Sequence, residues 1–196
     1  VENATVLVQN GRVVAASAGL ATPAGVEVID GTGKWVTPGI FSAITTLGLV
    51  DVDGVSESND TSAGRSPFSA ALDVAPAINP ASQQLLVARA DGITRASIAP
   101  QPASGIFGGQ GAVIDLGADA EPITKARAFQ IVALGETGAR LGGGGRTGTY
   151  AWLDNALHEA QAYAAGRWSG EDAELTRADA AALGPVVSGK QALYVH

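Results

Sequence analysis

The chain has 196 residues, of which 46% are hydrophobic, so it is long enough to bury a sizeable core and is not expected to be disordered. Its formal net charge is −7, from 19 acidic and 12 basic residues. Because phosphate binding depends on Lys and Arg, this acidic balance argues against nucleic acids and anionic membranes as partners. The sequence has no cysteine, which excludes disulfides, thiolate zinc sites and cysteine nucleophiles. No apolar run reaches the length of a membrane span.

The sequence also has no methionine, and therefore no start residue of its own. We expect that a tag, a signal peptide or another segment has been removed from its front. A processed secretory signal would place the protein in the periplasm or outside the cell, and the cytoplasm is the alternative.

The first 37 residues predict a small antiparallel β unit of about four strands. Val6 and Val8 alternate with smaller or polar residues, and Asn10-Gly11 is a strong two-residue hairpin signal. The strands are expected at Ala4–Val8, Arg12–Ala16, Val26–Ile29 and Lys34–Thr37.

Beyond Pro38-Gly39, apolar strand patterns alternate with helical patterns, which is typical of an α/β domain with a parallel sheet. Strands are expected at Ile40–Val50, Gly92–Ala99, Ala112–Leu116 and Gln191–His196. Helices are expected at Thr124–Leu134, Tyr150–Gly166 and Thr176–Leu183, while Gln83–Ala90 fits a short helix or a strand. An eight-stranded barrel needs about 250 residues, so the sheet is interpreted as unfinished and the ending on an apolar strand as a truncation.

The segment Val26–Ile40, VEVIDGTGKWVTPGI, resembles the opening segment of the amidohydrolase superfamily, and most closely its imidazolonepropionase-like branch. The resemblance continues at Leu47-Gly48, at Gly92–Ala96 and at Gly109–Leu116, and it ends at Ala192–His196. It implies an α/β fold, namely the N-terminal part of a (β/α)8 TIM-type barrel preceded by part of a small β-sandwich. Residues 1–37 would be the β-sandwich part, and residues 38–196 would be the first portion of a barrel that is incomplete in this chain.

In that family, the strand after Pro-Gly carries a His-x-His pair that binds divalent metal. Here the two positions are Ile44, which has no donor atom, and Thr46, which offers a weak neutral oxygen. His196 matches a histidine that is a metal ligand in active relatives, so the resemblance implies a residual ligand there. One divalent metal, zinc, is expected in the complete protein and none in this chain alone, because zinc hydrolases use about three protein ligands.

Other candidates are weaker. Asp51, Asp53 and Glu57 follow the first strand of the larger segment and are candidates for a ligand-binding loop, although a solvated loop is the simpler interpretation. His158 lies on the polar side of a helical pattern and is interpreted as a surface residue. Gly105–Gly111 and Gly142–Gly145 are not followed by Lys-Ser/Thr, which excludes a P-loop.

The resemblance implies a hydrolase that acts on non-peptide, amide-type C–N bonds of a small-molecule substrate. The isolated chain is expected to be inactive, and its catalytic residues are not assigned. The alternative is a catalytically inactive relative that keeps the fold and binds a small molecule or a partner. A missing C-terminal half of the same protein is the expected partner, and self-association into a homo-oligomer is also expected because an unfinished sheet leaves open edges.

Overall fold

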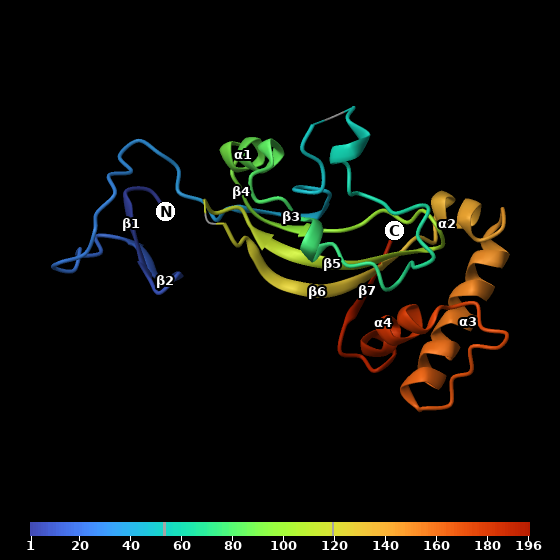
Figure 1. The fold of residues 1–196 in the computed structure, drawn as a ribbon. Coiled ribbons are helices and arrows are strands. Elements are labelled where there is room, and N and C mark those ends of the chain that lie inside the picture. The colour runs from blue at the N-terminus through green and yellow to red at the C-terminus, as the bar shows by residue number, and fades with distance from the viewer. Residues whose placement is uncertain (53, 119) are drawn as a thin grey trace. The chain divides into compact units, whose positions relative to one another are not determined.

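The computed structural model describes residues 1–52, 54–118 and 120–196, and its internal contacts divide the chain into two units, Val1–Pro38 and Gly39–His196. The strands are β1 (Ala4–Gln9), β2 (Arg12–Ala18), β3 (Ile40–Thr45), β4 (Ile93–Ile98), β5 (Phe107–Asp115), β6 (Ile123–Val132) and β7 (Ala192–Val195) (Figure 1). The α-helices are α1 (Gln83–Ala90), α2 (Glu136–Leu141), α3 (Arg146–Ala164) and α4 (Arg177–Val187), and short 3-10 turns occur at Ser56–Ser58 and Ala75–Ala77.

The first unit contains the predicted hairpin. β1 and β2 pair antiparallel, with Gln9 opposite Arg12. Asn10 and Gly11 have φ values of 51° and 71°, and two consecutive positive φ angles are the signature of the turn that matches strand twist in two-residue hairpins.

The other two strands predicted for this unit, Val26–Ile29 and Lys34–Thr37, are wrong. Neither segment pairs with another strand, and Trp35 is 95% exposed. Their β-branched residues fit a strand, but within residues 1–38 no described strand lies beside them to supply ladder hydrogen bonds.

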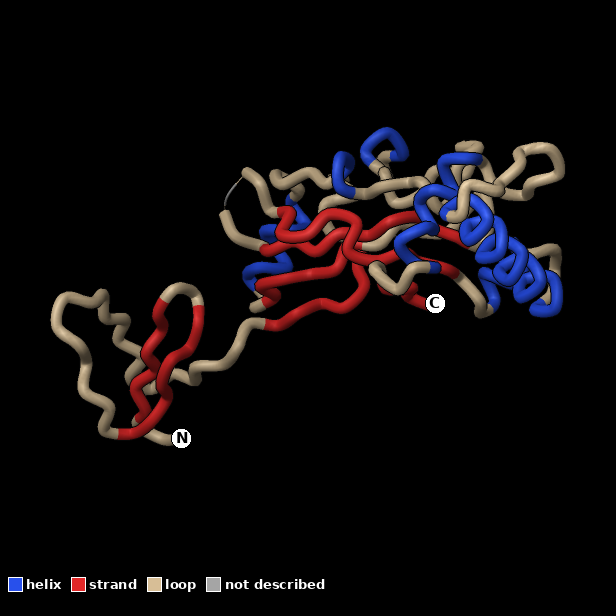
Figure 2. The backbone as a smooth tube through the Cα atoms, turned by 90° about the horizontal axis from the view of Figure 1, so that it is seen from below, coloured by secondary structure: helices blue, strands red, loops and turns tan. Residues whose placement is uncertain are grey.

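The second unit is built on one curled, mixed sheet with strand order β3-β4-β5-β6-β7 (Figure 2). β3 pairs parallel with β4, and β6 pairs parallel with β7, but β5 runs antiparallel to both of its neighbours. The predicted N-terminal part of a (β/α)8 barrel is therefore wrong, because a barrel of that type consists of parallel strands that are each followed by a helix. The unit is a small α/β fold with four α-helices among its described residues.

The predicted helix at Thr124–Leu134 is also wrong, since Ile123–Val132 forms β6. A run of about ten residues with scattered apolar positions fits both the period of a helix and the period of a strand. β-branched and aromatic residues such as Ile123, Phe129 and Ile131 favour a strand. Pairing with β5 settles the conformation, with Gln110 opposite Gln130 and Gly111 opposite Phe129. β5 itself starts earlier than predicted and includes the glycine-rich residues 108–111.

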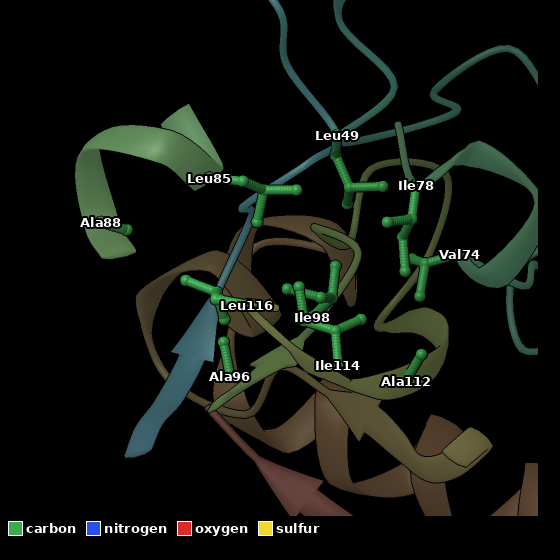
Figure 3. Packing of buried hydrophobic residues seen from close by; sticks show 10 residues of the cluster. All are labelled: Leu49, Val74, Ile78, Leu85, Ala88, Ala96, Ile98, Ala112, Ile114 and Leu116. Carbon is green, nitrogen blue, oxygen red and sulfur yellow. The ribbon is translucent and has the colours of Figure 1, made fainter. Parts of the chain in front are cut away.

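One core cluster lies between α1, the segment around residues 74–78, and strands β4 and β5. Leu85 of α1, Ile98 of β4 and Ile114 of β5 are each at most 2% exposed. Figure 3 shows these side chains converging with Leu49 and Ile78, which lie in the long connection between β3 and α1. The predicted strand Ile40–Val50 is thus divided, because β3 ends at Thr45 and the buried Leu49 packs as part of this connection.

A second core cluster joins α3 and α4 to strands β5, β6 and β7. The predicted stripe of α3 is confirmed, since Ala156 and Ala160 are fully buried and Trp152, Leu153 and Tyr163 pack around them. No helix in the described parts of the chain is long and apolar enough to cross a membrane.

Helix α4 begins as predicted and ends later than predicted. The Thr176 hydroxyl accepts a hydrogen bond from the Asp179 backbone N–H at 3.1 Å, which confirms Thr176 as the N-cap. The sequence predicts Gly184 just after the last turn, but the helix continues through Pro185 to Val187.

The buried Asp179 carboxylate (the residue is 2% exposed) connects α4 to a loop more than a hundred residues earlier in the sequence. Its Oδ1 accepts hydrogen bonds from the backbone N–H groups of Ser69 (2.9 Å) and Ala71 (2.8 Å). Its Oδ2 accepts a hydrogen bond from the Thr176 hydroxyl at 2.7 Å. Three donors therefore surround one carboxylate and stabilise the junction between the loop and α4. The two backbone N–H groups, of Ser69 and Ala71, have no other hydrogen bond among the described residues.

The two faces of the sheet differ in what covers them. Val132 of β6 packs with α3 and α4, whereas Phe129 and Ile131 point to the opposite face and pack with Ala99. A Cβ atom at Gly111 would overlap the Phe129 ring, so the absence of a side chain there leaves room for the ring against β5. The same ring stacks on Tyr194 of β7, with centroids 4.2 Å apart.

Replacing Gly111 by Ala is expected to destabilise the fold by about 2 kcal/mol or more, because the Phe129 ring must leave its position. The control is Gly184→Ala, whose methyl group meets no atom beyond its chain neighbours and which is expected to change stability by less than about 1 kcal/mol, because crowding before Pro185 offsets the gain in helix propensity. Urea denaturation of both variants measures the difference. Equal stability of the two variants would show that the Phe129 ring does not depend on the space at Gly111.

Replacing Asp179 by Ala is expected to cost about 3 kcal/mol or more, because it leaves buried N–H groups unpaired. Asp179→Asn should cost less, since one amide oxygen still accepts from Ser69 and Ala71. Asp154→Ala removes a carboxylate that is 78% exposed and should change the free energy of unfolding by less than about 0.5 kcal/mol. A cost at Asp179 as small as that at Asp154 would show that the junction does not depend on this carboxylate.

Candidate functional site

The candidate site is a pocket of about 530 Å³ at one end of the sheet. Because β5 alone is reversed, the carboxyl ends of β3, β4, β6 and β7 all point to this end. Ligands of open α/β sheets bind beyond the carboxyl ends of the strands. The lining residues come from these strand ends and from α2, and they are Ile44, Thr45, Thr46, Ala99, Pro100, Gln101, Pro102, Ile131, Thr137, Arg140 and His196.

The backbone of His196 is held tightly at the end of β7. Its N–H donates to the Val132 carbonyl at 2.8 Å, and its carbonyl accepts from the N–H groups of Leu134 (2.7 Å) and Gly135 (3.2 Å). These bonds connect the end of β7 to the loop that leads into α2. The imidazole therefore stands on a fixed backbone although the residue is exposed.

The end of β3 is fixed in a similar way. The Thr45 carbonyl accepts from the Ala99 N–H at 2.9 Å, and the Thr45 hydroxyl donates to the Ser97 carbonyl at 3.3 Å. The next residue, Thr46, is half-buried, and its hydroxyl has no hydrogen bond to any described residue. Thr45 is thus used by the fold, while the Thr46 hydroxyl remains available to a ligand.

Three residues singled out from the sequence line this one pocket, namely Ile44, Thr46 and His196. His196 lies 150 positions after Thr46 in the chain, and the shared direction of β3, β4, β6 and β7 brings the two segments to the same end of the sheet. This convergence supports the choice of the pocket as the candidate site.

The loop carboxylates do not join them. Asp51 lines a different pocket of about 530 Å³ beside α1, and both of its carboxylate oxygens accept from the Asn79 side-chain amide, at 2.8 and 2.9 Å. Glu57 lies on the 3-10 turn Ser56–Ser58, where its Oε2 accepts from the Ser56 hydroxyl at 3.1 Å. Asp53 lies outside the described residues. The contacts of Asp51 and Glu57 organise the connection between β3 and α1.

His158 also lies away from the pocket. Its Nδ1 is 2.9 Å from the Asp154 carbonyl on α3, and its side chain is 69% exposed. It is a surface residue of the helix, in agreement with its position in the sequence pattern.

The residues of the pocket do not fit a zinc site by themselves. His196 supplies one imidazole, Thr46 supplies a neutral hydroxyl and Ile44 supplies no donor. Across the described parts of the chain, no group of three or more His, Cys, Asp and Glu side chains is placed to hold a metal ion. This donor set falls short of the three protein ligands that a catalytic zinc requires.

Three polar residues of the pocket, Gln101, Thr137 and Arg140, are not indicated by the sequence patterns. Thr137 and Arg140 lie on α2, a six-residue helix that is not predicted, because the preceding strand is interpreted as a helix. The signal that could have found them is their position directly after the end of a buried strand, where functional residues of α/β folds gather.

The glycine-rich residues 108–111 have a packing role. Gly111 makes room for Phe129, and Gly109, at a φ of 124°, lies against the Leu72 carbonyl, where a Cβ atom would come within 2.6 Å of the oxygen. The close approach of backbone in this segment is to the protein itself.

No protein-family model and no curated protein sequence matches this chain. Among solved structures, it is similar to the crystal structure of an amidohydrolase from Thermotoga maritima MSB8, with 25% sequence identity and a TM-score of 0.80. The match covers 97% of this chain and 52% of that chain, so the chain spans about half the length of its structural neighbour. This similarity supports an amidohydrolase-like relationship, which is a coarse resemblance to a family of hydrolases.

Proposed function

We propose that the chain belongs to a hydrolase that cleaves amide-type C–N bonds, and that the substrate binds in the pocket at the strand ends. The observation that carries the proposal is the similarity to an amidohydrolase over 97% of the chain, at a TM-score of 0.80. The motif around Pro38-Gly39 supports the imidazolonepropionase-like branch as the finer assignment.

The pocket provides the groups that bind an amide. The free hydroxyls of Thr46 and Thr137 donate hydrogen bonds to a carbonyl oxygen, and Ile44 and Ile131 contact apolar parts of the substrate. A volume of about 530 Å³ fits a small molecule. These residues account for binding and orientation.

The pocket residues alone do not support zinc chemistry, since they do not form a zinc site. If the complete protein uses a divalent metal, His196 supplies one ligand and a segment outside these 196 residues supplies the others. We propose such a segment as the partner of this chain, in keeping with a neighbour that is about twice as long.

A second candidate function is small-molecule binding without catalysis. It is favoured by the replacement of the expected histidine pair by Ile44 and Thr46, which leaves the pocket walls in place without metal ligands. Hydrolysis by the unmodified, full-length protein separates the two candidates.

Filling the pocket should abolish hydrolysis. Thr46→Trp is expected to lower kcat/KM at least about 10-fold, because the indole occupies the space of the substrate. The matched control is Thr147→Trp, at an exposed position of α3 outside the pocket. Amine release from a panel of lactams and N-acyl amino acids, followed with fluorescamine, measures the rates.

Equal rates for the two tryptophan variants would exclude the pocket as the substrate site. If the complete protein, with the segment outside these 196 residues, releases no amine from any compound of the panel, the hydrolase proposal is overturned and the non-catalytic candidate is favoured.

Restoring the histidine pair should create a metal site. The double variant Ile44→His/Thr46→His places two imidazoles in the pocket with His196, and zinc affinity is expected to rise by about 100-fold or more. Adding His196→Ala to the double variant should reverse most of the gain. Isothermal titration with zinc measures each affinity.

The control for adventitious binding is Ile29→His/Thr32→His, which introduces the same residue types in an exposed loop of the first unit. A gain as large in this control, or a gain that survives His196→Ala, would show that the three positions do not converge on one metal.

A further inference from the structure

Gln130 of β6 is a fully buried polar side chain on the face of the sheet opposite the pocket at the strand ends. Side chains alternate between the two faces of a strand, so Gln130 points away from the face of Ile131, which lines that pocket, and shares the face of Val132. Helices α3 and α4 cover this second face. Gln130 is 0% exposed, and neither its side-chain nitrogen nor its side-chain oxygen has a hydrogen-bond partner among the described residues.

Two further glutamines lie over the same part of the sheet. Gln110 of β5 is directly opposite Gln130 in the ladder and is 6% exposed. Gln191 directly precedes β7, and its Nε2 donates to the Gln110 Oε1 at 3.4 Å. Because β6 lies between β5 and β7, this contact crosses β6 on the face that carries Gln130. The three side chains therefore form a glutamine cluster, Gln110, Gln130 and Gln191, inside the protein.

The orientation of the Gln191 amide is fixed by its neighbours. Its Nε2 also donates to the Arg127 carbonyl at 2.8 Å, so exchanging its nitrogen and oxygen would set the oxygen against two acceptors. The Gln191 Oε1 is thus an acceptor, and it is buried without a donor among the described residues. Exchanging the two amide atoms of Gln130 satisfies neither of them, since both are unpaired.

The unpaired atoms of the glutamine cluster require a ligand that both donates and accepts. A buried amide without partners bears the full cost of its desolvation, and buried polar groups are therefore hydrogen-bonded to protein or to ordered water. The cluster offers a donor at Gln130 Nε2 and acceptors at Gln130 Oε1 and Gln191 Oε1. Water satisfies groups of both kinds, whereas a metal cation or a simple anion satisfies one kind only.

We propose that the glutamine cluster binds internal water, including a molecule that accepts from Gln130 Nε2 and donates to Gln191 Oε1. This water connects β6 to the start of β7 beneath α3 and α4, where the two side chains make no direct hydrogen bond. It enters beside the amino end of β7, where Gln191 is half-buried and Arg127 is exposed. The site lies on the other face of the sheet from the pocket at the strand ends, so the inference does not rest on the proposed function.

A crystal structure of the unmodified protein, at a resolution that shows ordered water, tests the inference directly. We expect electron density for water within hydrogen-bond distance of both Gln130 Nε2 and Gln191 Oε1. A structure without water at the Gln130 amide, or one in which this amide bonds directly to another side chain, would overturn the inference.

Replacing Gln130 by Met tests the same inference through stability, because Met keeps the length of the side chain and removes both polar atoms. If water binds the amide, the variant deprives that water of its partner, and the urea midpoint is expected to fall by about 0.5 M or more. If the amide is unpaired, its removal relieves a desolvation cost and the midpoint rises.

The matched control is Gln161→Met, the same replacement at an exposed position of α3, which should leave the urea midpoint unchanged. A midpoint of Gln130→Met that rises, or that equals the midpoint of the control, would count against bound water and overturn the inference. Should Gln130→Met fail to fold, the crystal structure of the unmodified protein decides, since it requires no variant.

Discussion

The reversal of β5 is the constraint on which the rest of the larger unit depends. With β5 antiparallel to β4 and β6, the four remaining strands share one direction, and their carboxyl ends meet at the pocket. The reversal is possible because the chain returns through a short connection between Asp115 and Ile123. The Phe129 ring of β6 packs against β5 at Gly111, where the absence of a side chain leaves room for it. The same ring stacks on Tyr194 of β7. One glycine thereby links the central strand to β6 and β7.

Local signals of the sequence were reliable where local physics decides the structure. Asn10-Gly11 forms the predicted hairpin, and Thr176 caps α4 through a bond to the third residue of that helix. Signals failed where a distant partner decides. Val26–Ile29 has strand propensity but no neighbouring strand within residues 1–38, and Thr124–Leu134 became a strand because β5 lies beside it. The barrel expectation came from the family resemblance, and the helix predicted at this place agreed with it because it continued the alternation of strands and helices.

The candidate site was predictable in part for a related reason. Ile44, Thr46 and His196 were singled out by the resemblance to a family pattern, and they converge because each lies at a strand end. Asp51 and Glu57 were chosen for their charge and for the loop that they share, and their hydrogen bonds turn them to partners within that connection. Arg140 and Thr137 belong to a helix too short to have a periodic pattern, so no sequence pattern indicates their place beside His196.

The backbone of the pocket is fixed independently of the side chains of Ile44, Thr46 and His196. At β7, the N–H and carbonyl of His196 bond to Val132, Leu134 and Gly135, and at β3 the Thr45 carbonyl bonds to Ala99. All of these hydrogen bonds join backbone groups, so they do not involve the side chains that line the pocket. Because the frame is hydrogen-bonded on its own, the side chains at positions 44 and 46 can determine the chemistry of the wall without requiring the sheet to change.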